Sequence, residues 1–507
     1  MSDDSVAAAL RSDAHLVVIE APAGCGKTFQ AAEFAKDAVT DLATGERILI
    51  LTHTHAACTV FRARTKDAGS RVQIGTIDSL IVQIAIAYHR TLGLPADVTA
   101  WAFAHADDGF DQLAAKVSSL LGRSSAICGA LATRYPIVIC DEHQDASEAQ
   151  HEVIMAIGNA GARLLVFADP MQSIYGNDVQ MNAQAVRWAE LRDTSDAFEL
   201  LDTPHRWAQG SHRLGDWILE ARETLQRGRP VDLRGRLPQG LSIIEADNAA
   251  QRHGQYQVSR DQGRQINRVL QGGRSLLILS AHNATIRGLN AMWGRSIPIW
   301  EGFTRPALSQ LAIRCRQQAG NALALAECFC DFVGEVGIGF TPSAFGNRLK
   351  QEVRTECLRP CRGKPALIQN LALCFLQQPD HRGMGRALNL LHGMIKDEEA
   401  FSGVKIDLRR EFFEALQLMD FEDPELGFTQ LNSRRSQLPP TMPRRSISSI
   451  HKAKGLECEN ALMLPCDRQH FSAGNKNRCL LYVGLSRASH TLALVVSPLS
   501  QSPWITI

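Results

Sequence analysis

Short apolar runs and helical segments alternate along the first third of the chain. Residues 16–20, 48–52, 135–140 and 164–168 are apolar runs of five or six residues, a length typical of buried strands. Residues 29–39, after the first run, follow the helical period instead. Strands that alternate with helices predict an α/β fold built on a mostly parallel sheet.

Each of three predicted strands ends in a residue with ionic or metal-binding chemistry. Lys27 follows the first run within a glycine-rich stretch, Asp141 follows the third, and Asp169 follows the fourth. In parallel α/β sheets, ligands bind beyond the carboxyl ends of the strands. The pattern therefore places these side chains at one edge of one sheet.

The rest of the chain predicts a second α/β domain interrupted by helices. Residues 81–134 are helical in pattern and indicate a small insertion. Residues 306–425 are also mostly helical, and 432–445 are rich in Ser, Pro and Arg, which favours an exposed linker. Strand character returns in three further segments: 275–279, 461–464 and 492–495.

Composition limits the class of protein but not its partner. The chain has 507 residues, enough for about three domains. Its net charge of +1 gives no argument for a nucleic-acid partner, so any phosphate contacts require locally clustered basic residues. We expect a cytoplasmic protein with free thiols and no membrane contact, because the chain shows no apolar run of about 18 residues and no secretory signal.

Residues 21–28 (Ala-Pro-Ala-Gly-Cys-Gly-Lys-Thr) form a strand–loop–helix pattern that predicts a phosphate-binding loop. Glycines let backbone N–H groups approach phosphate oxygens, and the helix N-terminus adds its positive dipole. Lys27 would neutralise the β- and γ-phosphates, and Thr28 would bind Mg²⁺. The alternative, a glycine turn followed by a chance Lys-Thr, does not explain the flanking strand and helix. The predicted nucleotide-binding residues here are Ala23, Gly24, Cys25, Gly26, Lys27 and Thr28.

A second element is a pair of adjacent carboxylates at a strand end. Asp141 would hold Mg²⁺ through water, and Glu142 would polarise the attacking water. An apolar run ending in Asp-Glu can also be a solvated strand end. The phosphate-binding loop nearby favours the catalytic interpretation.

The segment Asp-Glu-His-Gln-Asp at 141–145 resembles the second motif of UvrD/Rep-type superfamily 1 DNA helicases. The resemblance extends in the family's order from residue 21 to residue 488, and leaves 81–134 and 306–445 uncovered. Within 141–145, His143 would couple the nucleotide site to DNA, although a packing role explains it nearly as well. The other segments that resemble family motifs are 52–57, 75–80, 169–176, 205–206, 449–457 and 481–488.

The resemblance implies two RecA-like domains with ATP and Mg²⁺ between them. The first would comprise residues 1–195 with the insertion at about 81–134. The second would comprise 196–305 and 446–507, with a helical insertion domain at 306–445. The family moves 3′ to 5′ on single-stranded DNA, and we expect the same here.

The resemblance also assigns roles residue by residue. Gln172 in the first domain would join Lys27, Thr28, Asp141 and Glu142 around the γ-phosphate. Arginine fingers would come from the second domain, where a finger of this kind raises the rate by about 10³–10⁵. The second-domain residues implied at the nucleotide are Arg206, Arg487, His205, Gly455 and Glu457. The residues implied at DNA are Thr52, Thr54, Thr76, Tyr175 and His451.

The chain departs from the family at the positions that hold the nucleotide base and the DNA strand. Val6 stands where the family has a glutamine that reads adenine, and His205 replaces the tyrosine that stacks on it. Selectivity for adenine is therefore open. Asn177 or Asp178 replaces an aromatic that stacks on a DNA base. The remaining aromatic candidates for stacking are Tyr175, Trp207 and Trp300, with core packing the favoured role of both tryptophans.

The insertions are short, which indicates a compact variant. Only 65 positions separate Thr76 from Asp141, so we expect efficient translocation but poor unwinding by the single chain. The 20 residues after Arg487 leave no room for a nuclease domain, so a partner protein would cut the DNA. Compact helicases of this kind accompany OLD-type nucleases in Gabija-type antiphage systems. An alternative function is a regulatory subunit that senses nucleotide and DNA for such a nuclease.

Two weaker signals stay open. Cys328, Cys330, Cys357 and Cys361 could bind a metal, but their spacing favours buried free thiols. Two arginine clusters could contact phosphates or be solvated linker charge. They contain Arg227, Arg229, Arg234 and Arg236, and Arg434, Arg435, Arg444 and Arg445.

Overall fold

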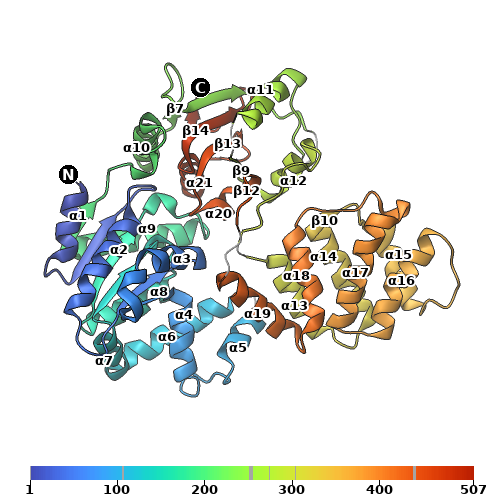
Figure 1. The fold of residues 1–507 in the computed structure, drawn as a ribbon, viewed down its shortest axis with the longest axis horizontal. Coiled ribbons are helices and arrows are strands. Elements are labelled where there is room, and N and C mark those ends of the chain that lie inside the picture. The colour runs from blue at the N-terminus through green and yellow to red at the C-terminus, as the bar shows by residue number, and fades with distance from the viewer. Residues whose placement is uncertain (1, 106–107, 251–254, 273–274, 303, 438–440) are drawn as a thin grey trace. The chain divides into compact units, whose positions relative to one another are not determined.

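The computed structural model describes residues 2–105, 108–250, 255–272, 275–302, 304–437 and 441–507. The chain divides into two compact units (Figure 1). Unit 1 comprises Met1–Trp293 and Arg444–Ile507, and unit 2 comprises Gly294–Pro443. Unit 1 carries both large sheets and every segment that resembles a helicase motif.

The first sheet of unit 1 has six strands, all parallel, in the order β3-β2-β4-β5-β1-β6. Four of these strands are the ones predicted from apolar runs. The edge strands β3 and β6 contain too many polar residues to have been predicted from apolar runs. The strands are β1 (Leu16–Glu20), β2 (Ile48–Thr52), β3 (Val72–Thr76), β4 (Ile137–Cys140), β5 (Arg163–Ala168) and β6 (Ala197–Leu200).

Helices cover both faces of this sheet, which explains the continuous apolar runs of its four central strands. Along β1, Val17 and Ile19 pack into one core, while Leu16 and Val18 pack into the other. One face carries α1 (Ser2–Arg11), α2 (Lys27–Ala38) and α3 (His55–Arg64). The other carries α4 (Ile77–Ala87), α5 (Val98–Ala104), α6 (Gly109–Arg123), α7 (Ser125–Arg134) and α8 (Glu148–Asn159), and α9 (Asp178–Thr194) follows β5.

The second sheet of unit 1 has five parallel strands in the order β12-β9-β13-β14-β8. Two parallel sheets with many helices confirm the predicted α/β class and are consistent with two RecA-like domains. Its strands are β8 (Leu241–Glu245), β9 (Leu276–Ser280), β12 (Arg445–Ser449), β13 (Cys458–Cys466) and β14 (Ala488–Val496). Its helices are α10 (His212–Gln226), α11 (Arg260–Gln271), α12 (Asn283–Met292), α20 (Ile450–Ala453) and α21 (Asn475–Leu485), and β7 (Val231–Asp232) pairs with β15 (Ile505–Thr506).

Unit 2 is mainly helical, in agreement with the pattern of residues 306–425. Its core includes a chain of phenylalanine rings, among which Phe340 stacks on Phe345 at 4.9 Å and Phe329 meets Phe375 edge-on at 5.6 Å. The helices are α13 (Pro306–Gln317), α14 (Ala322–Val336), α15 (Asn347–Arg354), α16 (Lys364–Gln377), α17 (His381–Asp397), α18 (Arg409–Gln417) and α19 (Pro424–Gln437), and β10 (Gly337–Ile338) pairs with β11 (Lys405–Ile406).

The interpretation of 432–445 as an exposed linker is wrong at both ends. Helix α19 continues to Gln437, where Arg435 is buried and forms an ion pair with Glu414. At the other end, Arg445 begins β12, which pairs along its whole length with β9. Tertiary packing overrides the local Ser, Pro and Arg composition; residues 438–440 lie outside the described residues.

The cysteines of unit 2 do not converge. Cys361 accepts a hydrogen bond from Arg348 at 3.1 Å, and Cys328 is buried in α14. Among the residues that the structure describes, no group of three or more His, Cys, Asp or Glu side chains could hold a metal ion. Over the same residues, none of the helices has the length and apolar character needed to span a bilayer.

Candidate nucleotide site and nucleic-acid face

The loop between β1 and α2 has the backbone shape of a phosphate cradle. Gly24 and Gly26 adopt left-handed φ angles of 78° and 86°. A Cβ at Gly24 would lie 2.8 Å from Cβ of Arg206 and from the ring of Trp207. Glycine is therefore required at this position both for its φ angle and for the close approach of the second domain.

Lys27 points from this loop at the two predicted carboxylates. Its Nζ lies 3.2 Å from Oδ1 of Asp141 and forms a short ion pair with Glu142. Burial lowers the pKa of Lys27, but the charges of Asp141 and Glu142 outweigh it and raise the pKa overall. The ammonium thus stays charged inside the site, where it can neutralise either the carboxylates or phosphate oxygens.

Glu142 is held as a carboxylate in a strained backbone position. Its φ is 56°, in the left-handed region that a non-glycine residue rarely adopts. Its side chain accepts hydrogen bonds from Lys27 and Gln144. Burial raises its pKa, but the charges of Lys27 and Lys454 outweigh that effect and lower the pKa. A group that accepts a proton from water must be ionised, and Glu142 meets this condition.

Asp141 and Thr28 offer a donor set that suits Mg²⁺. Burial raises the pKa of Asp141, and the positive charge of Lys27 opposes it. Oδ1 of Asp141 is buried and accepts no hydrogen bond from any described residue, although Lys27 is close enough for an ion pair. Carboxylate and hydroxyl oxygens are ligands that Mg²⁺ prefers, so the residues fit this ion.

Asp169 is the centre of a buried network that sequence reasoning missed. It is 0% exposed and accepts hydrogen bonds from Gln172 Nε2 at 2.9 Å, from Tyr482 OH at 3.2 Å and from Arg222 Nη2 at 2.8 Å. Arg222 also bonds Oε1 of Glu20 at 2.6 Å. Tyr482 lies within the sixth resembling segment and offered a signal. Arg222 is one arginine on an amphipathic helix and offered none.

Tyr482 also joins the second domain to the phosphate loop directly. The backbone N–H of Ala23 donates to its hydroxyl at 2.9 Å. The backbone N–H of Arg206 donates to the carbonyl of Gly24 at 3.0 Å. The two sheets of unit 1 therefore meet at the loop, as a nucleotide site between two domains requires.

The two predicted arginine fingers are bonded within the second domain in this structure. Arg206 donates to Ser486 O at 2.5 Å and to Glu457 at 2.7 Å. Arg487 is 1% exposed and donates to Val483 O at 2.8 Å and to Ser486 Oγ at 2.6 Å. Burial lowers the pKa of Arg487 to about 10. The backbone of Arg206 thus contacts the loop, whereas the guanidinium of Arg487 bonds Val483, Leu456 and Ser486.

The remaining predicted nucleotide residues are His205, Glu457 and Gly455. His205 lies against Gly26, where a Cβ would be 3.0 Å from the imidazole Cδ2. Glu457 is exposed and pairs with Arg206. Gly455 is exposed and has a φ of 79°. His205 and the Glu457–Arg206 pair therefore lie next to the loop.

The residues predicted at DNA lie in two groups. Thr52 and Thr76 are register partners at the carboxyl ends of β2 and β3, and both are buried. Thr54 and Thr76 cap helices α3 and α4 with their hydroxyls. Tyr175, 44% exposed, donates to the carbonyl of His451 at 3.3 Å. Only the second group presents an aromatic face to solvent.

Two aromatic candidates for base stacking are excluded by burial. Trp207 is fully buried and donates to Ala488 O at 2.7 Å, and Trp300 is buried in unit 2. Core packing, the favoured role, accounts for both. Asn177, at the position of the family's stacking aromatic, instead caps α9 with its side chain.

Lys454 was also missed, although it stands inside the fifth resembling segment. Its ammonium bonds Asp145 of the first domain and the carbonyl of Gln172. It also lies 5.1 Å from the centroid of the Tyr175 ring. One cation thus contacts the second and third resembling segments together.

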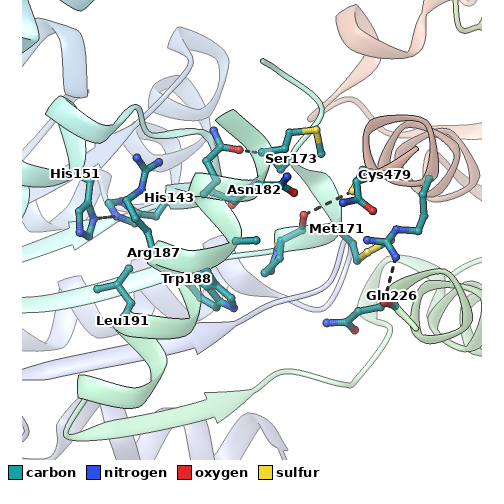
Figure 2. A pocket seen from close by; sticks show the side chains of 17 residues that line it. His143, His151, Met171, Ser173, Asn182, Arg187, Trp188, Leu191, Gln226 and Cys479 are labelled. Atoms are coloured by element: carbon teal, nitrogen blue, oxygen red, sulfur yellow. Dashed lines mark hydrogen bonds between the residues drawn. The ribbon is translucent and has the colours of Figure 1, made fainter. Parts of the chain in front are cut away.

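A cavity of about 140 Å³ lies behind these segments (Figure 2). His143 and His151, side by side in Figure 2, share a hydrogen bond of 3.0 Å. Helix α9 contributes Arg187 and Trp188, and Cys479 comes from α21 of the second domain. The cavity is therefore lined by residues of both RecA-like domains.

Comparison with known proteins fits this geometry. Residues 103–178 match the UvrD/REP helicase N-terminal domain family, a stretch that includes Asp141, Glu142 and Gln172. Residues 446–495 match the UvrD-like helicase C-terminal domain family, which includes Lys454 and Arg487. No curated protein matches the chain. Together, the two domain matches support a UvrD-type superfamily 1 helicase and indicate an ATP-dependent DNA helicase.

Proposed function

We propose that this chain is a translocase that moves 3′ to 5′ along single-stranded DNA and serves as the motor of a DNA-processing complex. The observation that carries the proposal is the junction at the phosphate loop. Ala23 of the first domain donates to Tyr482 of the second, beside the ion pairs of Lys27. A nucleotide bound there would contact both domains, so its hydrolysis can move one against the other.

The first-domain residues divide the chemistry among them. Lys27 neutralises the β- and γ-phosphates and must leave its carboxylate partners to do so. Glu142, ionised and held by Gln144, accepts a proton from the attacking water. Thr28 and Asp141 would hold Mg²⁺, which neutralises phosphate charge when bound. Gln172, whose amide donates a hydrogen bond to Asp169, contacts the γ-phosphate.

The second-domain arginines complete the site only after a rearrangement. Arg206 and Arg487 exchange their hydrogen bonds to Ser486 for bonds to the γ-phosphate. An arginine finger of this kind raises the hydrolysis rate about 10³–10⁵-fold. Hydrolysis is therefore coupled to the approach of the two domains.

The single-stranded DNA lies across Tyr175 and His451. Thr52, Thr54 and Thr76 lie at the adjacent ends of the β-strands. Tyr175 is the exposed aromatic that can stack on a base, a contact worth about 1–3 kcal/mol. Lys454 connects this face to Asp145 and so to the nucleotide carboxylates. DNA occupancy can then change the nucleotide site.

A second candidate function is a nucleotide- and DNA-sensing regulatory subunit of a partner nuclease. The burial of Val6 and the capping role of Asn177 favour it, because both positions lack the family's usual grip on base or strand. The partner in either case would be a nuclease, with an OLD-type enzyme of a Gabija-type antiphage system as the specific candidate. Co-expression with such a nuclease and co-purification of the complex tests the partnership.

Two measurements on the purified chain separate the functions. A motor shows ATP hydrolysis that rises with single-stranded DNA, and stopped-flow arrival of the chain at a labelled 5′ end after a lag that grows with strand length. Lys27→Ala and Glu142→Ala abolish both. Nucleotide-dependent DNA binding without a length-dependent lag identifies the regulatory function instead. Strong duplex unwinding by the single chain would contradict the expectation of a compact, partner-dependent motor.

A further inference from the structure

A carboxylate lies beside the phosphate loop, in contact with His205, the residue that replaces the family's base-stacking tyrosine. The Nε2–H of His205 donates to both carboxylate oxygens of Asp3, at 3.1 Å and 3.2 Å. His205 in turn rests on Gly26 of the loop. About a quarter of the Asp3 side chain is exposed, so a bound molecule can reach it.

Helix α1 offers this carboxylate in place of an amide. Val6, at the position where an adenine-reading glutamine would stand, is fully buried in the core between α1 and the sheet. Asp3 lies one turn earlier on the same side of the helix and reaches the site instead. Gln30 adds a weaker contact, with its amide Nε2 3.5 Å from the carbonyl of Asp3.

The same region has an apolar wall. Phe29 follows Thr28 at the start of α2 and is half exposed, which is unusual for a large apolar side chain. The guanidinium of Arg64 lies 5.9 Å from its ring centroid. Burial raises the pKa of Glu457, but Arg206, Arg487 and Arg64 outweigh it and lower the pKa. Phe29 directly precedes Gln30, the residue whose amide contacts Asp3.

A carboxylate discriminates between the two purines by hydrogen-bond polarity. It accepts hydrogen bonds but donates none. Guanine presents two adjacent donors, N1–H and N2–H, which match the two oxygens. Adenine presents one donor at N6 beside the N1 lone pair, which a carboxylate repels. An amide, which both donates and accepts, reads adenine at N6 and N7.

We propose that Asp3 sets the base specificity of this motor, so that guanine nucleotides bind at least as tightly as adenine nucleotides. The base lies between Phe29 and His205, with its N1–H and N2–H donated to Asp3. Gln30 is close enough to donate to O6. This inference rests on the proposed function only in that the loop binds a nucleoside triphosphate. It makes GTP a fuel alongside ATP.

The test compares equilibrium binding of GDP and ADP to the full chain by competition with a fluorescent nucleotide. In the wild-type protein, GDP is expected to bind at least as tightly as ADP. In Asp3→Asn, the new amide reads adenine, and the GDP-to-ADP affinity ratio falls about tenfold or more. Asp4→Asn, an exposed neighbour on α1, is the matched control and keeps the wild-type ratio. Asp3→Ala lowers GDP affinity and leaves ADP affinity within about twofold.

Two results overturn the proposal. One is a wild-type preference for ADP of tenfold or more. The other is a ratio that stays the same in Asp3→Asn as in the wild type. Hydrolysis of ATP stimulated by single-stranded DNA is measured in parallel. If DNA stimulates ATP hydrolysis but the GDP-to-ADP affinity ratio contradicts the proposal, only the role of Asp3 in base specificity is refuted. If neither nucleotide binds, the proposed function is refuted as well.

Discussion

The ammonium of Lys454 lies 2.8 Å and 2.5 Å from the two carboxylate oxygens of Asp145. Both side chains are buried, and the same ammonium donates to the carbonyl of Gln172 at 2.6 Å. The pair therefore crosses between the two RecA-like domains and ends three residues from Glu142. Lys454, which also lies 5.1 Å from the centroid of the Tyr175 ring, thus connects that ring to the segment that contains Glu142.

Lys454→Met should uncouple DNA binding from hydrolysis. We expect the stimulation of ATP hydrolysis by single-stranded DNA to fall about tenfold or more, while hydrolysis without DNA changes much less. Removal of one partner from a buried pair also costs about 3–5 kcal/mol, because the other charge is left unpaired. A double-mutant cycle with Asp145→Asn separates the two effects. Strictly additive losses of stimulation would contradict a direct coupling.

Glu142→Gln should stop hydrolysis but spare nucleotide binding. The amide keeps the size of the carboxylate and loses its basicity, so the hydrolysis rate should fall by about 10²–10⁴. Nucleotide affinity should remain within a few-fold of the wild type. Glu148→Gln, at the exposed first turn of α8, is the control that leaves turnover unchanged. Normal turnover in Glu142→Gln would remove the residue from the mechanism.

Arg222→Met should destabilise unit 1 severely. The substitution leaves Asp169 and Glu20 buried without their cation, and losses of about 3–5 kcal/mol are typical of such cases. Arg227, five residues farther along at the end of α10 and paired with Glu223 on the surface, serves as the comparison. Arg227→Met should cost at most about 1 kcal/mol. Urea unfolding of the two variants measures the difference, and equal losses would refute the assigned role.

Stability should fall as the pH drops from about 6.5 towards 4. Burial lowers the pKa of His53 and of His151 to about 4, and lowers that of His143 well below its usual value. In the unfolded chain these groups take up protons near pH 6.5, whereas the folded protein excludes them. The free energy of unfolding is therefore greatest above that pH. Each group contributes a slope of at most about 1.4 kcal/mol per pH unit.

His151→Gln gives the sharpest test of this pH dependence. The substitution removes one imidazole that the folded protein keeps unprotonated, and the new amide can still bond His143. The thermal midpoint of the variant should therefore decline less steeply between pH 6.5 and 4.5 than that of the wild type. Parallel curves for the two proteins would show that His151 is protonated in the folded state.

The fold class and the placement of Asp141 and Glu142 beside Lys27 were predictable because they depend on local pattern. Buried parallel strands are apolar throughout, so β1, β2, β4 and β5 stand out in the sequence. Edge strand β3 reads Val-Gln-Ile-Gly-Thr, and β12 reads Arg-Ser-Ile-Ser-Ser. Such mixed runs become strands only because a neighbouring strand pairs with them. No local rule identifies them.

Arg222, the cationic partner of Asp169, was unpredictable for a related reason. Arg222 lies 53 positions from Asp169 and 202 from Glu20. Its burial depends on how α10 meets the first sheet, which periodicity does not encode. The same holds for Asp3, which is an ordinary acidic residue in a first helical turn until α1 brings it to His205. Residues within contiguous motifs are visible in one dimension, whereas those that hold them in place are not.

The left-handed backbone of Glu142 has a consequence for when the site is assembled. A φ of 56° costs of order 1–3 kcal/mol for a non-glycine residue, and the fold meets that cost once, as the chain folds. In the proposed mechanism the carboxylate is then preorganised: each turnover would begin with the base already aimed, so binding energy from nucleotide and DNA would remain available for moving the domains.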